Sequence, residues 1–458
     1  MKRSPALLIL IAISSEMASF SFFKNPVVLV MIPLIIVSIA CFLFRTEAKN
    51  TLFVAFTIII LTVLCSLRIA SVLTASSPDA AKAEFIGIVT EAGTFGRSQF
   101  LIVQSSEGAF VIKRPTSETY KLGETLSLRG WIKPFLIIRN NSDFDEATFW
   151  KSRGVRAEYA AASIKREADE FNLHLFRQLI HDKFKSMPET LRGYLDAMWT
   201  GVRDKELDDK HRRWGTSHLL SISGFHVGLI VGITELVFIF IRFRVRLRGF
   251  ILSFFVWIYI FISGAVPSAI RSACMFQVGI LSGILGRRIH PVNSVAVAAC
   301  LMLLYSPFLF WNIGWRLSVI ATLTITAISE LILDKKLKLW TWIIISPVVY
   351  LTTYPVVSSV FGSVPVVGII INAIGVPFFA FAFPFISLVA LTGLDVLHNI
   401  TDASLRLYGH ISDLLAWLVP WNIPYNTFFS MFCVMVFYGL LFSALRDKVT
   451  KVKSIKVS

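Results

Sequence analysis

The strongest constraint on this chain is a series of long apolar segments that carry no charged side chain. Residues 339–394 contain no Asp, Glu, Lys or Arg, and the same holds for four further segments: 26–44, 51–67, 249–270 and 421–445. A helix that crosses a bilayer needs about 20 apolar residues. Charged residues make up only 16% of the chain, against about 25% in soluble proteins. The sequence therefore predicts a mostly α-helical polytopic membrane protein.

The net charge of +16 does not by itself indicate a nucleic-acid-binding protein. In membrane proteins, Lys and Arg gather in cytoplasmic loops, where they set the orientation of the helices. Here the dense basic clusters, such as RFRVRLRG at 242–249, all fall on the cytoplasmic side of one consistent threading. That threading places the polar stretch 78–215 outside the cell membrane and the C-terminus in the cytoplasm.

The threading divides the chain into five parts. They are N-terminal transmembrane helices (1–77), an extracytoplasmic OB-like β-barrel domain (78–166), amphipathic outer-surface helices (167–215), a transmembrane domain (216–445) and a basic cytoplasmic tail (446–458). The first apolar segment fits either a cleaved signal or a first membrane helix.

Two kinds of segment within these parts depart from simple spanning helices. Residues 358–394 contain three prolines and several glycines. The chain is outside before this stretch, and a single later span must carry it to the cytoplasmic tail, so the stretch has to begin and end outside. We predict two short helices that dip into the membrane there. Segments 171–186 and 402–421 have apolar residues at helical spacing. This pattern predicts helices on the outer membrane surface or, equally, helices packed against the protein's own soluble part.

Residues 84–165 switch to the alternation of apolar and polar residues that is typical of strands, in five short runs separated by glycines. Five such strands fit a small OB-like barrel, a fold that often binds single-stranded nucleic acid by stacking bases on aromatic side chains beside a basic groove. The residues that could serve this role are Arg97, Phe100, Lys113, Arg114, Arg129 and Trp131. The alternative is that the aromatic side chains form the barrel core.

An arginine in an apolar segment, Arg271, is the strongest functional candidate among the intramembrane polar residues. It follows Pro267 in VPSAIRSACMFQ, and proline at that point is well placed as the first residue of a helix. A charge inside a membrane costs a few kcal/mol, so such residues usually have a function or a partner. We expect Arg271 either to meet an anionic ligand such as a phosphate or to pair with Glu235. Arg316, in NIGWRLSV, begins its helix in a similar way.

The segment GTSHLLSISGFHVGLIVG, residues 215–232, combines glycines, hydroxyls and two histidines at a membrane entry. Gly224, Gly228 and Gly232 form a ladder that predicts tight packing against another helix. His218 and His226 are eight residues apart, about 80° around a continuous helix, so both could face one hydrated lumen near Ser221.

The sequence gives no sign of a metal, cofactor or hydrolytic centre. The five cysteines lie in apolar segments without CxxC pairing, and the eight histidines form no HxxxH or HxHxD cluster. No acid at helical spacing would orient a Ser–His pair, and the P-loop pattern GxxxxGK[ST] is missing. We therefore expect no cofactor, no catalytic residue and neither ATPase nor nuclease activity from this chain.

Four motifs in order carry a family resemblance. The run LDAMWTGVRDKELDDKHRRWGTSHLLSISGFHVGLIVG, then ISGAVPSAIRSACM, NIGWRLSV and TYPVV…VPVVGIIINAIGVP, resembles the ComEC family of competence proteins, inner-membrane channels for incoming transforming DNA. The close of the polar domain, NNSDFDEATFWKSRGVRAEY, is similar to the end of the family's OB-like module. The likeness covers roughly residues 80–445.

The resemblance implies a set of pore residues in three walls. They are Thr216, His218, Ser221, Ser223, Gly224, His226 and Gly228 in the first wall, Pro267, Ser268 and Arg271 in the second, and Gly314, Arg316 and Ser318 in the third. The third motif departs from the family's usual G-F-Q-L-S, since GWRLS has arginine in place of glutamine. Many members also carry a C-terminal metallo-β-lactamase-like domain. We expect this chain to lack it and to translocate DNA without cutting it.

The family resemblance implies a channel that moves single-stranded transforming DNA across the cytoplasmic membrane during natural competence. The expected partners are single-stranded DNA, the lipid bilayer, a DNA receptor, a cytoplasmic motor and a separate nuclease. A transporter or pore for another anionic solute on the same fold is the alternative, because fold does not fix function.

Overall fold

The computed structural model describes most of the chain beyond residue 80. The described residues are 80–95, 98–115, 120–135, 145–167, 172–240, 245–284, 290–332, 341–392 and 394–455, with parts of 7–14 and 60–72. Most of the predicted N-terminal transmembrane helices, as well as Arg97, therefore lie outside the described residues. The chain forms two compact units, one of residues 5–183 with 299–315 and one of residues 184–298 with 316–458.

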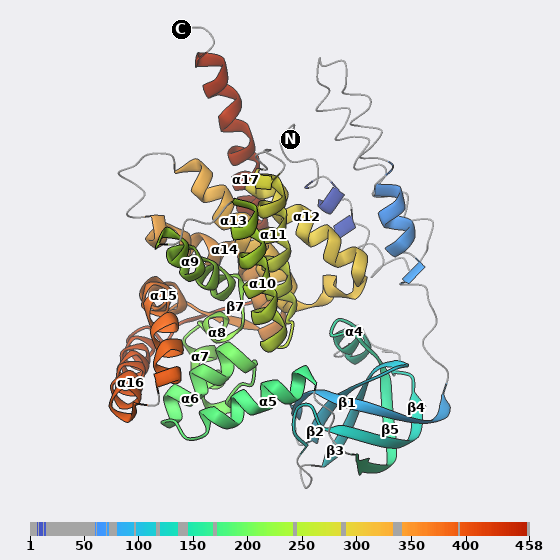
Figure 1. Cartoon of the computed structure of the whole chain (residues 1–458). Helices are drawn as coiled ribbons and strands as arrows, with labels where there is room; N and C mark the ends of the chain where they lie inside the picture. The colour runs from blue at the N-terminus through green and yellow to red at the C-terminus, as the bar shows by residue number, and fades with distance from the viewer. Residues whose placement is uncertain are drawn as a thin grey trace. The chain divides into compact units, whose positions relative to one another are not determined.

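A closed five-stranded barrel forms the core of the first unit (Figure 1). Its strands are β1 (Ala81–Phe95), β2 (Ser98–Ser105), β3 (Gly108–Pro115), β4 (Thr125–Lys133) and β5 (Val155–Arg166). They pair in the order β1-β2-β3-β5-β4, and only β3 and β5 run parallel to each other. The predicted barrel is confirmed, and this closed five-stranded arrangement is consistent with an OB fold.

Strand alternation explains the barrel core, since successive side chains of a strand point to opposite faces. The residues that fill the interior are apolar and almost wholly buried: Phe85, Val89, Leu101, Val103, Phe110, Ile112, Leu126, Leu128, Ile132, Ala157 and Tyr159. A second cluster packs Trp150, from helix α4 (Glu146–Lys151), against Phe100, with ring centroids 5.2 Å apart.

The start of helix α5 (Leu173–Phe184) contacts the barrel at Gly123. Asn172 caps the helix, because its Oδ1 accepts from Leu175 N at 2.8 Å while its Nδ2 donates to Gly123 O at 2.9 Å. Gly123 has φ +83°, and a Cβ added there would lie 2.2 Å from Leu175 N. Only glycine fits both this backbone conformation and this close approach.

The second unit is helical. Two helices, α12 and α13, contribute residues to both units. The elements are α6 (Glu189–Leu195), a π-helical turn (Asp196–Thr200), α7 (Lys205–Arg213), α8 (Ser217–Leu220), α9 (Gly224–Phe240), α10 (Val245–Ile262), α11 (Pro267–Ile284), α12 (Pro291–Tyr305), α13 (Ile313–Leu331), α14 (Thr341–Phe361), α15 (Gly368–Thr392), α16 (Asp395–Leu418) and α17 (Thr427–Ile455). Three segments among the described residues are long and apolar enough to cross a membrane: Ile343–Phe361, Gly368–Ala390 and Thr427–Ala444.

The prediction of two short helices over 358–394 is wrong. The chain instead makes a three-residue strand, β6 (Ser363–Pro365), and then the single helix α15, which continues through Pro377 and Pro384. Each internal proline costs about 3 kcal/mol. Breaking an apolar helix would expose several backbone groups, each at a cost of several kcal/mol where water is absent. The continuous helix is therefore the less costly solution.

Gly123 provides a test of this account of the barrel. We expect Gly123→Ala to lower the free energy of unfolding of the barrel by about 3 kcal/mol or more, since the left-handed backbone costs ~1–2 kcal/mol and the clash with Leu175 adds to it. Gly154 is the matched control, because it also has φ +83° but a Cβ there would meet nothing within 4 Å among the described residues. Amide exchange of β1–β5 in the full chain measures both effects, and equal losses would contradict the packing role of Gly123.

Candidate functional site

Three of the motif segments meet in the helical unit. Ser268 Oγ, in the first turn of α11, donates to Ile222 O at 2.7 Å, and Arg271 Nε donates to Ser318 Oγ on α13 at 2.9 Å. Gly224 lies so close to α11 that an added Cβ would be 2.6 Å from Ser272 Oγ. We call Ile222–His226, Ser268, Arg271, Ser272 and Ser318 the motif junction.

The first side of the motif junction is a break between two helices. Helix α8 ends at Leu220 and α9 begins at Gly224, so residues 221–223 are not helical. Side chains bond the freed backbone groups: Phe225 N donates to Ser223 Oγ, and Ser223 N donates to His226 Nδ1, both at 3.3 Å. Non-helical backbone at membrane depth is tolerated where it is buried in protein or lines a hydrated cavity.

This break overturns the prediction that His218 and His226 share one face of a continuous helix. His226 is fully buried, with its ring 5.0 Å from that of Phe383 on α15, and its Nε2 has no hydrogen-bond partner among the described residues. His218, on α8, is instead exposed, and Ser221, at the break, is half-buried.

The second side of the motif junction is the start of α11. A turn with Gly264 at φ +88° and Ala265 at φ +51° leads into Pro267, which is the first residue of the helix as predicted. A positive φ is uncommon for alanine and costs about 1–2 kcal/mol. The turn and Pro267 together fix the direction of the first helical turn, and they place Arg271 beside Ser318 of α13.

Arg271 is buried, with 2% of its surface exposed, and its contacts are neutral. Besides Ser318, its guanidinium donates to Ser272 Oγ at 3.1 Å and approaches Met275 Sδ at 2.8 Å. The predicted alternative of an ion pair with Glu235 is wrong, because Glu235 pairs with Arg248 of α10. No carboxylate lies within ion-pair distance of Arg271 among the described residues. A buried charge without an opposite charge is costly, and an incoming anion would remove that cost.

Helix α13 begins within the third motif, at Ile313. Asn312 caps the helix, since its Oδ1 accepts from Trp315 N at 3.1 Å. Gly314 is exposed and Arg316 is half-buried, both in the first turn. Ser318, rather than Arg316, is the α13 residue that contacts Arg271.

The glycine ladder does not pack as predicted. Only Gly224 contacts another helix closely, whereas a Cβ on Gly228 or Gly232 would meet nothing within 4 Å among the described residues. The same holds for Gly279 and Gly283 of α11. At 100° per residue these two point within about 20° of Ser272, the residue that meets Gly224. Gly224 and Ser272 thus face each other across the two helices. By the same rule Gly228 and Gly232 point about 40° and 80° away from Gly224, and these two glycines, like Gly279 and Gly283, are exposed.

A buried polar cluster next to this site escaped the sequence analysis. His211, on α7, lies with Nδ1 2.9 Å from Thr216 Oγ1 and Nε2 2.8 Å from Tyr194 Oη on α6. Trp214, the residue just before the GTSH segment, is bonded to α16, because its Nε1 donates to Asp413 Oδ1 at 2.9 Å. These contacts position the GTSH segment that leads to His218. Sequence spacing gives no signal for them, because the partners come from distant elements.

The candidate DNA-binding residues of the barrel differ in whether their side chains are buried, paired with a carboxylate or exposed to solvent. Phe100 is buried against Trp150, so its ring is not open to a base. Lys113 bridges Glu146 and Glu158 at 2.5 and 2.9 Å, and Arg114 donates to Ala161 O. Arg129 pairs with Glu84 at 2.7 Å on the surface. Trp131 is 49% exposed and lies opposite Lys82 across the β1–β4 pair.

The chain belongs to the competence protein family. The family model described as Competence protein matches residues 200–449, which include all three sides of the motif junction. No solved structure matches the chain.

Three curated relatives share parts of this region. ComE operon protein 3 of Bacillus subtilis (strain 168) is 25% identical over 248 residues, 52% of this chain and 32% of that protein. Recombination protein 2 of Haemophilus influenzae is 26% identical over 189 residues, 39% of this chain and 24% of that protein. The MG316 homolog of Mycoplasma pneumoniae is 31% identical over 124 residues, 27% of this chain and 30% of that protein. The chain thus spans a third or less of the length of these relatives.

His211 makes the stability of this region depend on pH. Burial lowers the pKa of His211 from 6.5 to about 3, although a hydrogen bond with Thr216 opposes the shift. Because the folded pKa is below the unfolded one, the unfolded chain binds the proton first as the pH falls. The stabilisation is complete above about pH 6.5 and is lost as the pH falls toward 3, with a loss of about 3 kcal/mol by pH 4.

We therefore expect amide protection of residues 205–220 to fall between pH 7 and pH 4 in the wild type. The slope should flatten in His211→Asn and stay unchanged in His410→Asn, which removes an exposed histidine of α16. Hydrogen exchange on the full chain measures both slopes. An unchanged slope in the His211 variant would show that another group carries the dependence.

Proposed function

We propose that this chain conducts single-stranded transforming DNA across the cytoplasmic membrane during natural competence. Membership of the competence protein family supports a role in DNA uptake. The observation that carries the finer proposal is Arg271, a buried arginine with no carboxylate partner in the described part of the chain, at the point where three motif segments meet. DNA brings a negative charge with every nucleotide, so its path through a membrane needs hydrogen-bond donors and positive charge.

The phosphate backbone passes Arg271 in this proposal. The guanidinium is held by Ser318 and Ser272, whose hydroxyls can rotate to donate to a phosphate oxygen. Arginine offers several N–H donors in a fixed planar fork, which suits phosphate geometry better than a lysine does. In this proposal the strand reaches Arg271 past His218 and Ser221, and Arg316 adds a second positive charge at the start of α13.

Beyond the motif junction, the strand runs in this proposal along the exposed glycines of α9 and α11. Gly228 and Gly232 on α9 and Gly279 and Gly283 on α11 present backbone without side chains. Such a surface leaves room for bulky bases of any kind, and transforming DNA has no fixed sequence.

The barrel lies outside the cytoplasm in this proposal, with the C-terminal tail inside. Its DNA contact is reduced to the surface of β1 and β4, where Trp131 offers a stacking face beside Lys82 and Arg129. The DNA receptor, the cytoplasmic motor and the nuclease are separate proteins that act on the same strand. Neither a metal nor a cofactor takes part in the conduction step proposed for this chain.

Replacement of Arg271 tests the cationic contact. We expect Arg271→Ala to lower uptake of labelled DNA into a nuclease-resistant pool at least tenfold, since the phosphates would lose their buried counter-charge. Arg271→Lys should restore part of the uptake. Arg248→Ala is the matched control, because Arg248 already pairs with Glu235 and should leave uptake near the wild-type level. Normal uptake by a stably expressed Arg271→Ala variant would refute the contact.

Filling the glycine face tests the path. We expect Gly232→Leu to fold and insert normally, because nothing described lies within 4 Å of an added Cβ, and to lower DNA uptake at least tenfold by narrowing the space. Gly439→Leu on α17 is the matched control, since its surroundings are equally open and it lies on another helix. Quantitative membrane blots establish equal amounts of protein. If both variants take up DNA normally, the strand does not pass along α9.

A further inference from the structure

Helix α16 exposes a line of large apolar side chains, while its exposed charged residues Asp395, Arg406 and Asp413 lie elsewhere on the helix. Thr401 and Asp402 are buried, and Asp402 accepts from Leu191 N of α6 at 2.8 Å and from Arg406 Nε at 2.6 Å. Its large apolar residues are exposed, with Leu407 at 60%. We call the exposed set the α16 stripe: Val396, Ile400, Leu407, Ile411, Leu414 and Leu418.

The α16 stripe is one continuous surface. At 100° and 1.5 Å per residue, its members fall within about 40° of one line and extend for roughly 33 Å. A stripe of this length matches the hydrocarbon thickness of a bilayer, about 30 Å, and is far larger than isolated exposed leucines on a soluble protein. Water is a poor partner for such a surface.

Helix α15 lies antiparallel beside α16 and presents a second stripe. Val366 N donates to Trp421 O at 3.0 Å at one end of the pair, and His398 Nε2 lies 3.2 Å from Val389 O at the other. Five of the exposed residues of α15 share one line in the same way: Ile370, Ile374, Phe381, Phe385 and Leu388. The exposed Val376 points away from this line. Helix α15 has no charged residue and a mean hydropathy of 2.2 over 368–390, which is the composition of a helix in contact with lipid.

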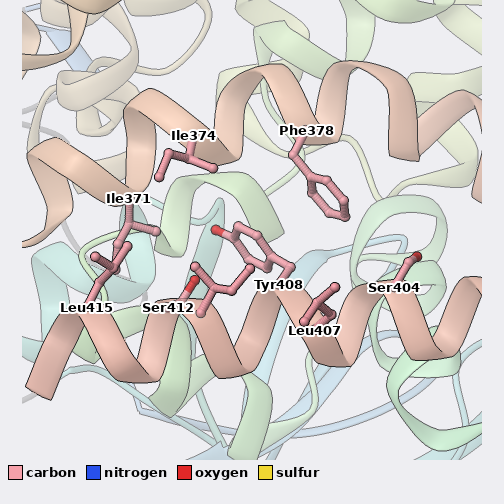
Figure 2. Close-up of a pocket in the computed structure, with 9 residues that line it drawn as sticks. Ile371, Ile374, Phe378, Ser404, Leu407, Tyr408, Ser412 and Leu415 are labelled. Atoms are coloured by element: carbon pink, nitrogen blue, oxygen red, sulfur yellow. The ribbon is translucent and has the colours of Figure 1, made fainter.

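A groove of about 230 Å³ runs between the two stripes (Figure 2). Ile374 of α15 and Leu407 and Ile411 of α16 belong both to the stripes and to the walls of the groove. Phe378, whose ring stacks on Tyr408 with centroids 5.1 Å apart, and Leu415 are half-buried in the walls, while Ile371 and Tyr408 are buried. The groove is thus continuous with the lipid-facing side of α15, and its walls are almost wholly apolar.

We propose that the acyl chains of membrane lipids cover both stripes and that one acyl chain occupies the groove between α15 and α16. The reason is continuity: the molecules that surround the exposed side of α15 also reach the adjoining side of α16, which has the matching apolar chemistry. The charged residues of α16 lie away from the stripe. At 100° per residue, Asp395, Arg406 and Asp413 are exposed but point about 100–120° from Leu407, and Asp402, at about 140°, is buried. The site does not depend on the proposed passage of DNA.

The stripe is tested with the full chain in nanodiscs of phosphatidylethanolamine and phosphatidylglycerol. A polarity-sensitive fluorophore is attached at Leu407→Cys and, as a water-facing control, at Asp209→Cys on the charged helix α7, where the native residue is exposed. We expect nitroxide-labelled acyl chains to quench the Leu407 site at least threefold more than the Asp209 site, and iodide to show the reverse. Quenching of both sites by iodide would overturn the proposal, and so would protection of the Leu407 site from both quenchers, because a second protein would then cover it.

The groove is tested with a phospholipid that carries a diazirine in its acyl chain. We expect cross-links to the peptides that contain Phe378 and Leu415. Ser404→Trp, which fills the groove from the α16 side, should lower their yield at least threefold. Cross-linking to Phe428 of α17, which is 84% exposed, should not change and serves as the internal control. Equal yields at the groove in variant and wild type would show that no acyl chain occupies it. DNA uptake is not a readout in either experiment, so the two proposals fail separately.

Discussion

The need to bond every backbone polar group without water governs the helical unit. Where the chain stays helical, the bonds are internal to the helix, and α15 keeps them through two prolines. Where the helix does break, between α8 and α9, side chains take over: Ser223 and His226 bond the free N–H groups, and Ser268 bonds the carbonyl of Ile222. The break is therefore possible only beside the first turn of α11, and this requirement brings the motifs together.

Basic side chains have different partners in the two units. On the barrel, Lys113 and Arg129 each meet a carboxylate at the surface, where such pairs contribute little to stability. In the helical unit, Arg271 is buried among serines and a thioether, and none of the described carboxylates lies within ion-pair distance of it. A protein gains nothing in stability from that arrangement. The proposed phosphate contact would supply the missing negative charge, whereas several basic residues of the barrel are already paired on its own surface.

Sequence patterns predicted the parts of the fold that depend on local periodicity. Alternating residues located all five strands, and Pro267 located the start of α11, because both signals reside in a few adjacent residues. The break after Leu220 was missed, since the apolar run 219–240 is compatible with one helix, and part of the support for the break comes from Ser268 on another helix. His211 was missed for a related reason: its partner Tyr194 lies on another helix. The open glycine faces could not be foreseen, because the same ladder serves equally for close packing.

The bond between Leu191 and Asp402 has a consequence for synthesis. The two residues are 211 positions apart, and the Asp402 carboxylate satisfies an N–H at the start of α6 that has no partner within that helix. Ribosomes add about 5–20 residues per second, so this carboxylate emerges roughly 10–40 s after α6. Other contacts of the segment from α6 to α8 become available earlier in synthesis, such as that of Tyr259 Oη with Met198 O, but the Leu191 N–H waits for Asp402. The order of translation thus makes the closing of this segment a late event, completed only when α16 arrives.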